Sequence, residues 1–315
     1  MNLEYVRQIR RTLMRDDFDV LFFPASSSIL KELDVDIPCV YLSDATFRLM
    51  TNYYPHFSNL WEFNKRSGER AEAAAIEKAK ALVYSSSWAA RSAIEHYGAC
   101  PERTHVIHLG ANFDEVPHRN VILSRRSIQK DRFELLFVGG DWRRKGGDIA
   151  LGVLARLQDR GIACTLTVAG SRPHGRVATT GVRFAGFLDK NTKAGMKALS
   201  QLYLQADVFL LPTRNEAAGI VFCEASAFGL PVVSTRTGGV ESYVEDGMTG
   251  FLCQHEEGID GYADRIERLV TNPDEHFRMS VNARDKFERE LNWDVWGRRV
   301  AEVLRDVCDK NGHPD

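Results

Sequence analysis

Short apolar runs, each bounded by glycine, proline or polar residues, alternate along the chain with longer segments of helical periodicity. Four runs lie in the first 108 residues, at 20–23, 39–42, 82–84 and 106–108, and five more follow at 135–138, 165–169, 182–184, 208–211 and 232–235. Runs this short are typical of strands buried in a parallel sheet. Helical patterns between them, such as 61–81, 148–160 and 193–205, predict crossover helices. The chain is therefore predicted to have an α/β fold with Rossmann-like sheets.

The periodicity stops between residues 113 and 132, where Pro117 and a charged run indicate an interdomain linker. With 315 residues, the chain has room for two domains. We expect an N-terminal Rossmann-like domain over 1–112, a C-terminal one over 133–290 and a final helix over 291–315 that crosses back to the first domain. The first domain begins with a helix and shows only four candidate strands, where such domains have about six, so it is predicted to be incomplete.

The stretch from 206 to 239 predicts one complete strand–helix–strand unit. A buried strand at 208–211 leads into a polar loop, and Gly219 then starts a helix that stops near Gly229 and Pro231. Ligands of open α/β sheets bind at this strand-to-helix edge. The N–H groups of Gly219, Ile220 and Val221, together with the helix dipole, predict a seat for a phosphate.

Two carboxylates frame this seat, Glu216 before the helix and Glu224 inside it. A carboxylate can accept two hydrogen bonds from a diol, so Glu224 suits a ribose and Glu216 suits a sugar hydroxyl beyond the phosphates. The alternative is that both are ordinary solvated residues.

A second glycine-rich turn follows the strand at 135–138. Gly139 and Gly140 precede the basic residues Arg143, Arg144 and Lys145. Basic residues at such a turn suit a diphosphate, with lysine as a point charge and arginine as a fork. A solvated charge run would look similar, and that alternative remains open.

The order Glu216, Gly219, Glu224, Gly229, Pro231, then Gly238 and Gly239, resembles the donor-site signature of the family 4 (group 1) retaining glycosyltransferases of GT-B fold. The resemblance extends over about 85–304. It implies two Rossmann-like domains facing across a cleft, and transfer of a hexose from a nucleoside diphosphate sugar, linked to UDP or GDP, to a saccharide, lipid-linked or small-molecule acceptor. No cofactor or metal is implied, and no Asp-x-Asp motif lies near the site.

The resemblance also implies individual roles. Lys145 and Arg144 or Arg143 would neutralise the leaving diphosphate, since Gly140 occupies the usual arginine position. Glu216 would hold the donor sugar, and the turn at Gly186 and Phe187 would pass beside the base.

The first domain departs from the family pattern in two ways, since it is predicted to be incomplete and it lacks one histidine of that pattern. Pro24 and Ala25 stand where many relatives carry a histidine, with His56 and Asp44 as weak substitutes. An accessory protein that binds a nucleotide sugar without turning it over is therefore the alternative function.

Composition limits the partners and the compartment. The net charge of −2 and pI near 6.5 give no argument for nucleic acid. Six cysteines without a CxxC pair suit reduced thiols in the cytoplasm. Residues 1–16 predict an amphipathic helix with Leu3, Val6, Ile9 and Leu13 on one face and arginines on the other. We expect it to pack on a sheet, and peripheral contact with the inner membrane is the alternative.

Overall fold

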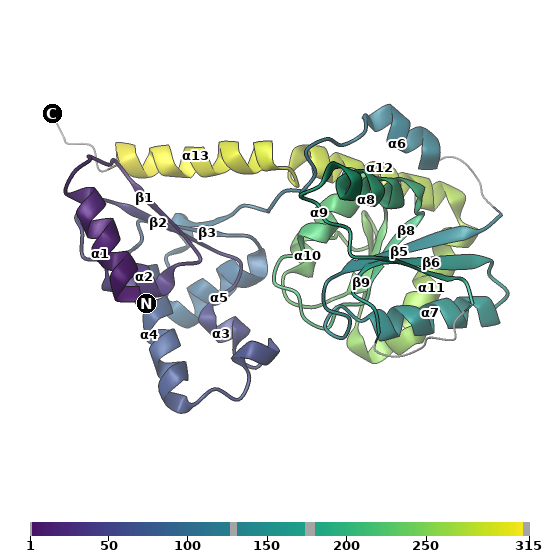
Figure 1. Ribbon diagram of the computed structural model, residues 1–315, viewed down its shortest axis with the longest axis horizontal. Coiled ribbons are helices and arrows are strands. Elements are labelled where there is room, and N and C mark those ends of the chain that lie inside the picture. Colours follow the sequence, from purple (N-terminus) through teal and green to yellow (C-terminus); the bar gives the residue numbers. More distant parts are fainter. Residues whose placement is uncertain (1, 127–130, 174–179, 311–315) are drawn as a thin grey trace. The chain divides into compact units, whose positions relative to one another are not determined.

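A computed structural model describes residues 2–126, 131–173 and 180–310, and divides the chain into two compact units (Figure 1). Unit 1 comprises the chain up to His108 and again from Asp294, whereas unit 2 runs from Leu109 to Trp293. Residues 127–130 of the predicted linker, residues 311–315 of the predicted final segment and the side chain of Leu3 lie outside the description.

Unit 1 contains a four-stranded parallel sheet of order β1-β2-β3-β4. Its elements are α1 (Asn2–Leu13), β1 (Leu21–Pro24), α2 (Ser27–Glu32), β2 (Cys39–Ser43), α3 (Phe47–Met50), η1 (Pro55–Phe57), α4 (Glu62–Lys78), β3 (Ala81–Tyr84), α5 (Ser87–Tyr97), η2 (Pro101–Arg103), β4 (Thr104–Val106) and α13 (Trp293–Asp309). The four strands predicted from the sequence are confirmed, with bounds that differ by up to two residues.

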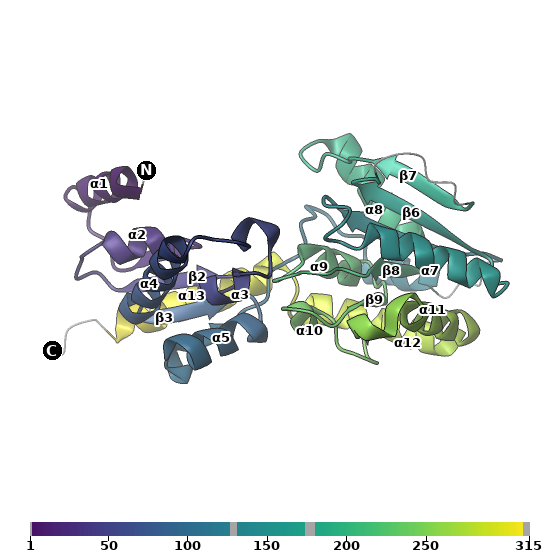
Figure 2. The same ribbon diagram turned by 90° about the horizontal axis from the view of Figure 1, so that it is seen from below.

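Helices cover both faces of the unit 1 sheet. Leu30 of α2 and Ile76 of α4 pack with Leu82 on one face, and Val303 of α13 packs with Val83 on the other. Figure 1 shows α13 and α5 on opposite sides of the strands, and β2 and β3 overlap α13 in the view of Figure 2. The amphipathic helix α1 contacts α2, with Val6 buried and Ile9 partly buried against the same core.

Unit 2 contains a six-stranded parallel sheet of order β10-β9-β8-β5-β6-β7. Its elements are α6 (Arg119–Arg126), β5 (Phe133–Gly139), α7 (Gly147–Asp159), β6 (Cys164–Gly170), β7 (Val182–Gly186), α8 (Lys193–Gln205), β8 (Val208–Leu211), α9 (Ile220–Ala227), β9 (Val232–Thr235), α10 (Val240–Tyr243), β10 (Gly250–Cys253), η3 (His255–Glu257), α11 (Gly258–Thr271) and α12 (Pro273–Arg289). The strand order reverses between β5 and β8, so the loops after these strands diverge at the carboxyl edge, where open α/β sheets bind ligands.

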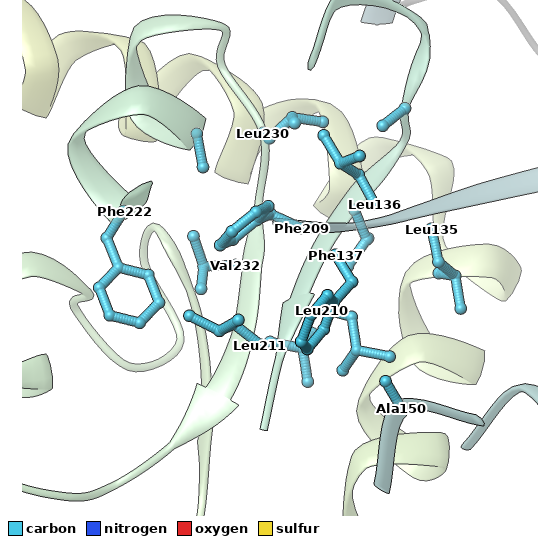
Figure 3. Close-up of a cluster of buried hydrophobic side chains, with 14 of the residues drawn as sticks. Leu135, Leu136, Phe137, Ala150, Phe209, Leu210, Leu211, Phe222, Leu230 and Val232 are labelled. Atoms are coloured by element: carbon cyan, nitrogen blue, oxygen red, sulfur yellow. The ribbon is translucent and has the colours of Figure 1, made fainter. Parts of the chain in front are cut away.

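The core of unit 2 is built by the apolar runs that the sequence marked as strands. Phe209, Leu210 and Leu211 of β8 are fully buried (Figure 3). Phe209 meets Phe222 of α9 edge to face, with ring centroids 6.2 Å apart. Full burial of such a side chain contributes about 1.5–3 kcal/mol, which holds the first turn of α9 against the end of β8.

The segment predicted as a linker contains a helix that packs in unit 2. Ile122 of α6 is fully buried, and the guanidinium of Arg126 is buried as well. Arg126 donates to the carbonyl oxygens of Tyr203, at 2.8 Å, and Phe228, at 3.1 Å. The charged run indicated a linker in the sequence because composition does not distinguish a buried arginine that binds helix-end carbonyls from a surface arginine.

Candidate functional site

Two loops meet at the carboxyl edge of the unit 2 sheet, one after β5 and one after β8. The backbone N–H of Arg214 donates to the carbonyl oxygen of Arg144 at 2.8 Å. Gly146 has a φ of +76°, and a Cβ there would overlap the carbonyl oxygen of Pro212. A glycine is therefore required where the two loops cross.

A buried ion pair lies where these loops touch. The ammonium of Lys145 donates to the carboxylate of Glu216, and both residues are less than 9% exposed. Arg144 Nη1 lies 3.8 Å from Glu216 Oε2 and donates to the carbonyl oxygen of Asn215 at 3.0 Å. Arg144 Nε also lies 3.7 Å from Asp141 Oδ2, so two cations and two carboxylates gather where the loops touch, and both cations can bind a ligand anion.

The first turn of α9 lies beside this pair. Gly219 is its N-cap, with a φ of +83°, and a Cβ there would lie 2.6 Å from the ring of Phe222 and 3.1 Å from Cγ of Glu216. The first hydrogen bond of the helix is donated by Phe222 to Gly219. The N–H groups of Gly219, Ile220 and Val221 therefore precede the helical ladder and form the positive end of the helix dipole.

Glu224 lies one turn further into α9 and has no exposed surface. It accepts hydrogen bonds from Lys190, from the hydroxyl of Tyr203 at 2.9 Å and from the backbone N–H of Asn112. Burial raises the pKa of Glu224 above its ordinary value, although Lys190 opposes the shift. The contact with a ribose that the sequence suggested remains a prediction, and the carboxylate already has three donors.

The glycines expected to bind a ligand differ in their surroundings. Gly139 is buried against the Lys145 side chain, whereas Gly140 is exposed and a Cβ there would meet no atom within 4 Å. Gly186 ends β7 with a φ of +73°, and the neighbouring Phe187 side chain is 81% exposed. An aromatic ring in this position can offer its face to a planar ligand.

Arg143 and Arg144 have different environments. Arg144 lies beside Glu216, whereas Arg143 is exposed and contributes its carbonyl oxygen to Arg214. Arg214 also pairs with Asp148 through two bonds of 2.8 and 2.9 Å. The pairing of Arg214 with Asp148 was not predicted from the sequence, although a basic loop residue and an aspartate in the first turn of a helix were visible signals.

In unit 1 the position of the missing histidine has an unusual backbone. Ala25 directly follows β1 with a φ of +48°, a conformation that side chains rarely adopt. Asp44 and His56, the weak substitutes, are both exposed.

The described part of the chain contains no group of three or more His, Cys, Asp or Glu residues that could hold a metal ion. Within those same ranges, the helices are too short or too polar to cross a bilayer.

Comparison with known proteins identifies the family. The family model described as glycosyl transferases group 1 matches residues 119–286, and glycosyltransferase family 4 matches residues 1–115. A D-inositol 3-phosphate glycosyltransferase of Thermomonospora curvata is 29% identical over 248 residues, which is 72% of this chain. The chain spans 57% of the length of that relative.

Solved structures show the same fold. Sucrose-phosphate synthase from Thermosynechococcus elongatus aligns with a TM-score of 0.74 at 18% identity, covering 98% of this chain and 78% of that one. Anabaena HepE in complex with UDP-glucose aligns with a TM-score of 0.68 at 18% identity, covering 96% and 82%. These glycosyltransferases have the GT-B fold, and the two parallel-sheet units of this chain have it too.

Proposed function

We propose a specific reaction for this chain, which belongs to the group 1 glycosyl transferases: it transfers a hexose from a nucleoside diphosphate sugar to an acceptor with retention of anomeric configuration. The single observation that carries the proposal is the buried Lys145–Glu216 pair beside the first turn of α9. This arrangement combines two cations and free helical N–H groups, which suits a diphosphate, with a carboxylate, which suits a sugar hydroxyl.

The chemistry required of these groups is mostly electrostatic. The bond between the anomeric carbon and the phosphate oxygen breaks, and its electron pair stays on the departing diphosphate. The acceptor hydroxyl oxygen bonds to the anomeric carbon, and the hydroxyl proton passes to the departing diphosphate. Lys145, Arg144 and the α9 amides stabilise that charge, because they are held in place before the reaction begins. Glu216 orients the donor sugar, Glu224 binds the ribose, and the turn at Gly186 and Phe187 contacts the base.

We take UDP as the first donor to test and GDP as the second. One neighbour of the same fold was solved with UDP-glucose, and basic residues that bind the diphosphate do not select the base. The acceptor is proposed to be a saccharide, a lipid-linked sugar or a small molecule, with unit 1 as its binding region. Nucleic acid is not proposed as a partner, and no metal or cofactor takes part.

A peripheral membrane contact is part of the proposal if the acceptor is lipid-linked. The arginines Arg7, Arg10 and Arg11 of α1 are exposed, which would allow contact with anionic lipid at the inner, cytoplasmic surface. The six free cysteines support a cytoplasmic location.

A thermal-shift screen across UDP-, GDP- and ADP-sugars would test donor binding, since a ligand of the native state raises its stability. We expect one nucleotide series to raise Tm, and Lys145→Met to remove that shift while the exposed control Lys197→Met retains it. Product analysis by NMR would then give the anomeric configuration. Donor binding without transfer or hydrolysis would favour the accessory function, and no response to any nucleotide sugar would overturn the donor site.

A further inference from the structure

A buried ion pair closes the part of unit 2 where the nucleotide ribose is proposed to bind. The carboxylate of Glu224 has no exposed surface, and its oxygens are occupied by Lys190, Tyr203 and the N–H of Asn112. Because the carboxylate is already enclosed, a ligand hydroxyl can bind Glu224 only if one of these donors leaves.

The three donors differ in their freedom to move. Tyr203 is fully buried, and its ring stacks with Phe228 and Phe209 at centroid distances of 5.4 and 5.8 Å. Asn112 contributes a backbone group. Only Lys190 combines a flexible side chain with contact to solvent, since 32% of its side chain is exposed. Lys190 is therefore the donor that can leave.

The ammonium of Lys190 is also held by a second contact. It lies 5.6 Å from the ring centroid of Phe113, and that ring packs edge to face against Tyr203 and Phe228. An ammonium between a buried carboxylate and an aromatic face is stabilised in the absence of ligand. A ligand must offset both contacts before it reaches Glu224.

We propose that Lys190 competes with the ribose diol of a nucleoside diphosphate for Glu224, and that it is a positioning residue which weakens the binding of ribonucleotides but not of deoxynucleotides. This rests on the proposed donor function. A diol can replace the ammonium because it donates two hydrogen bonds to one carboxylate. A 2′-deoxyribose donates only one, so a deoxynucleotide binds with Lys190 still on Glu224.

The test compares wild type with Lys190→Met, which keeps the apolar stem but removes the charge. Titration calorimetry with UDP, 2′-deoxy-UDP, GDP and 2′-deoxy-GDP gives four dissociation constants for each protein. If Lys190 occupies Glu224 in about nine of ten molecules, its removal lowers the Kd of the ribonucleotide about tenfold. The Kd of the deoxynucleotide stays within about twofold, so the preference for ribose widens about tenfold.

Controls separate this effect from altered folding. Lys193→Met lies nearby at an exposed position and is expected to leave all constants unchanged. If Lys190→Met does not fold, Lys190→Gln keeps a neutral donor at Glu224 and is expected to show the same trend. If Lys190→Met weakens the binding of ribonucleotide and deoxynucleotide equally, or changes neither, the proposed role of Lys190 is wrong. The proposed donor function is not affected by that outcome. Failure of wild type to bind any of the four nucleotides overturns the proposed function and this role with it.

Discussion

At the scale of single residues, Glu216 connects the parts of the proposed donor site. Its carboxylate accepts a hydrogen bond from the buried ammonium of Lys145, and its Oε2 lies 3.8 Å from Arg144 Nη1. Its backbone carbonyl oxygen accepts a hydrogen bond from the N–H of Gly239. Removing one partner of a buried pair leaves the other charge without compensation. Changes at Glu216 therefore affect the orientation of Lys145 as well as any contact with the sugar.

We expect Glu216→Gln to lower the rate of sugar transfer by about 100-fold or more, because the residue should orient the reacting sugar. Binding of UDP alone should change much less, since UDP lacks the sugar. Steady-state kinetics and calorimetry with UDP measure the two effects. The exposed Glu256→Gln serves as control, and equal losses in turnover and in UDP binding would contradict the assignment.

A second residue-scale prediction concerns Glu72 in unit 1. It is 2% exposed, accepts from the hydroxyl of Tyr41 at 3.2 Å, and burial raises its pKa to about 7. A raised pKa means that the protonated form is favoured in the folded state. Its contribution to stability is therefore present below the unfolded value of 4.5 and is lost as pH rises through about 7.

Glu72→Gln should remove this pH dependence. As pH rises from 4.5 to 8, the free energy of unfolding of unit 1 should fall by about 3 kcal/mol more in wild type than in the variant. Hydrogen exchange in β2 and β3 measures this free energy. Glu77→Gln on the exposed side of the same helix is the matched control. Parallel pH profiles of wild type and Glu72→Gln would show that Glu72 titrates normally.

The sequence identified the residues that lie close to each other along a loop or a helix turn. Glu216, Gly219 and Glu224 follow one spacing, and Lys145 lies after the neighbouring strand of the same edge. The sequence did not indicate the donors to Glu224, because no spacing rule links them to it and only folding brings them together. These donors are Lys190, Tyr203 and Asn112. The burial of Glu224 was also missed, since a helix-surface glutamate has the same sequence pattern.

At the scale of elements, the crossing of the two loops depends on Gly146. Gly146→Ala places a Cβ against the carbonyl of Pro212 in a left-handed backbone conformation. The strained backbone costs about 1–2 kcal/mol and the overlap about 1–3 kcal/mol more. We expect urea unfolding to show unit 2 destabilised by the sum of these two costs. UDP binding should weaken as well, because Lys145 directly precedes Gly146.

Gly140→Ala is the matched control for this variant. A Cβ at Gly140 meets no atom within 4 Å, so its stability should stay within about 0.5 kcal/mol of wild type. If both alanines behaved alike, the close approach at Pro212 would not constrain the loop.

Elements were predictable where hydrophobic runs were short and sharply bounded. The predicted bounds of β8, β9 and α8 are confirmed without a shift. Helix α6 was not predicted, because its buried face consists of Ile122 and Arg126, and such a short amphipathic pattern does not stand out among charged neighbours.

At the scale of the whole molecule, the donor site is proposed to lie within one unit. Saturating UDP, at about 100 times Kd, should stabilise unit 2 by about 2.7 kcal/mol. We expect slower hydrogen exchange in β5 and β8, with amides of β2 and β3 in unit 1 unchanged. Equal protection of both sheets would mean that the nucleotide stabilises unit 1 as well.

The chain enters unit 1 twice, and this has a consequence for how the protein is made. Val300, Val303 and Val307 of α13 cover the sheet face formed by Val40 and Val83. A ribosome synthesises these valines only after all of unit 2, so that apolar face stays open to water while about 185 further residues emerge. During translation unit 1 is thus the last unit to be completed. Until then the nascent chain exposes an apolar surface that a chaperone could shield.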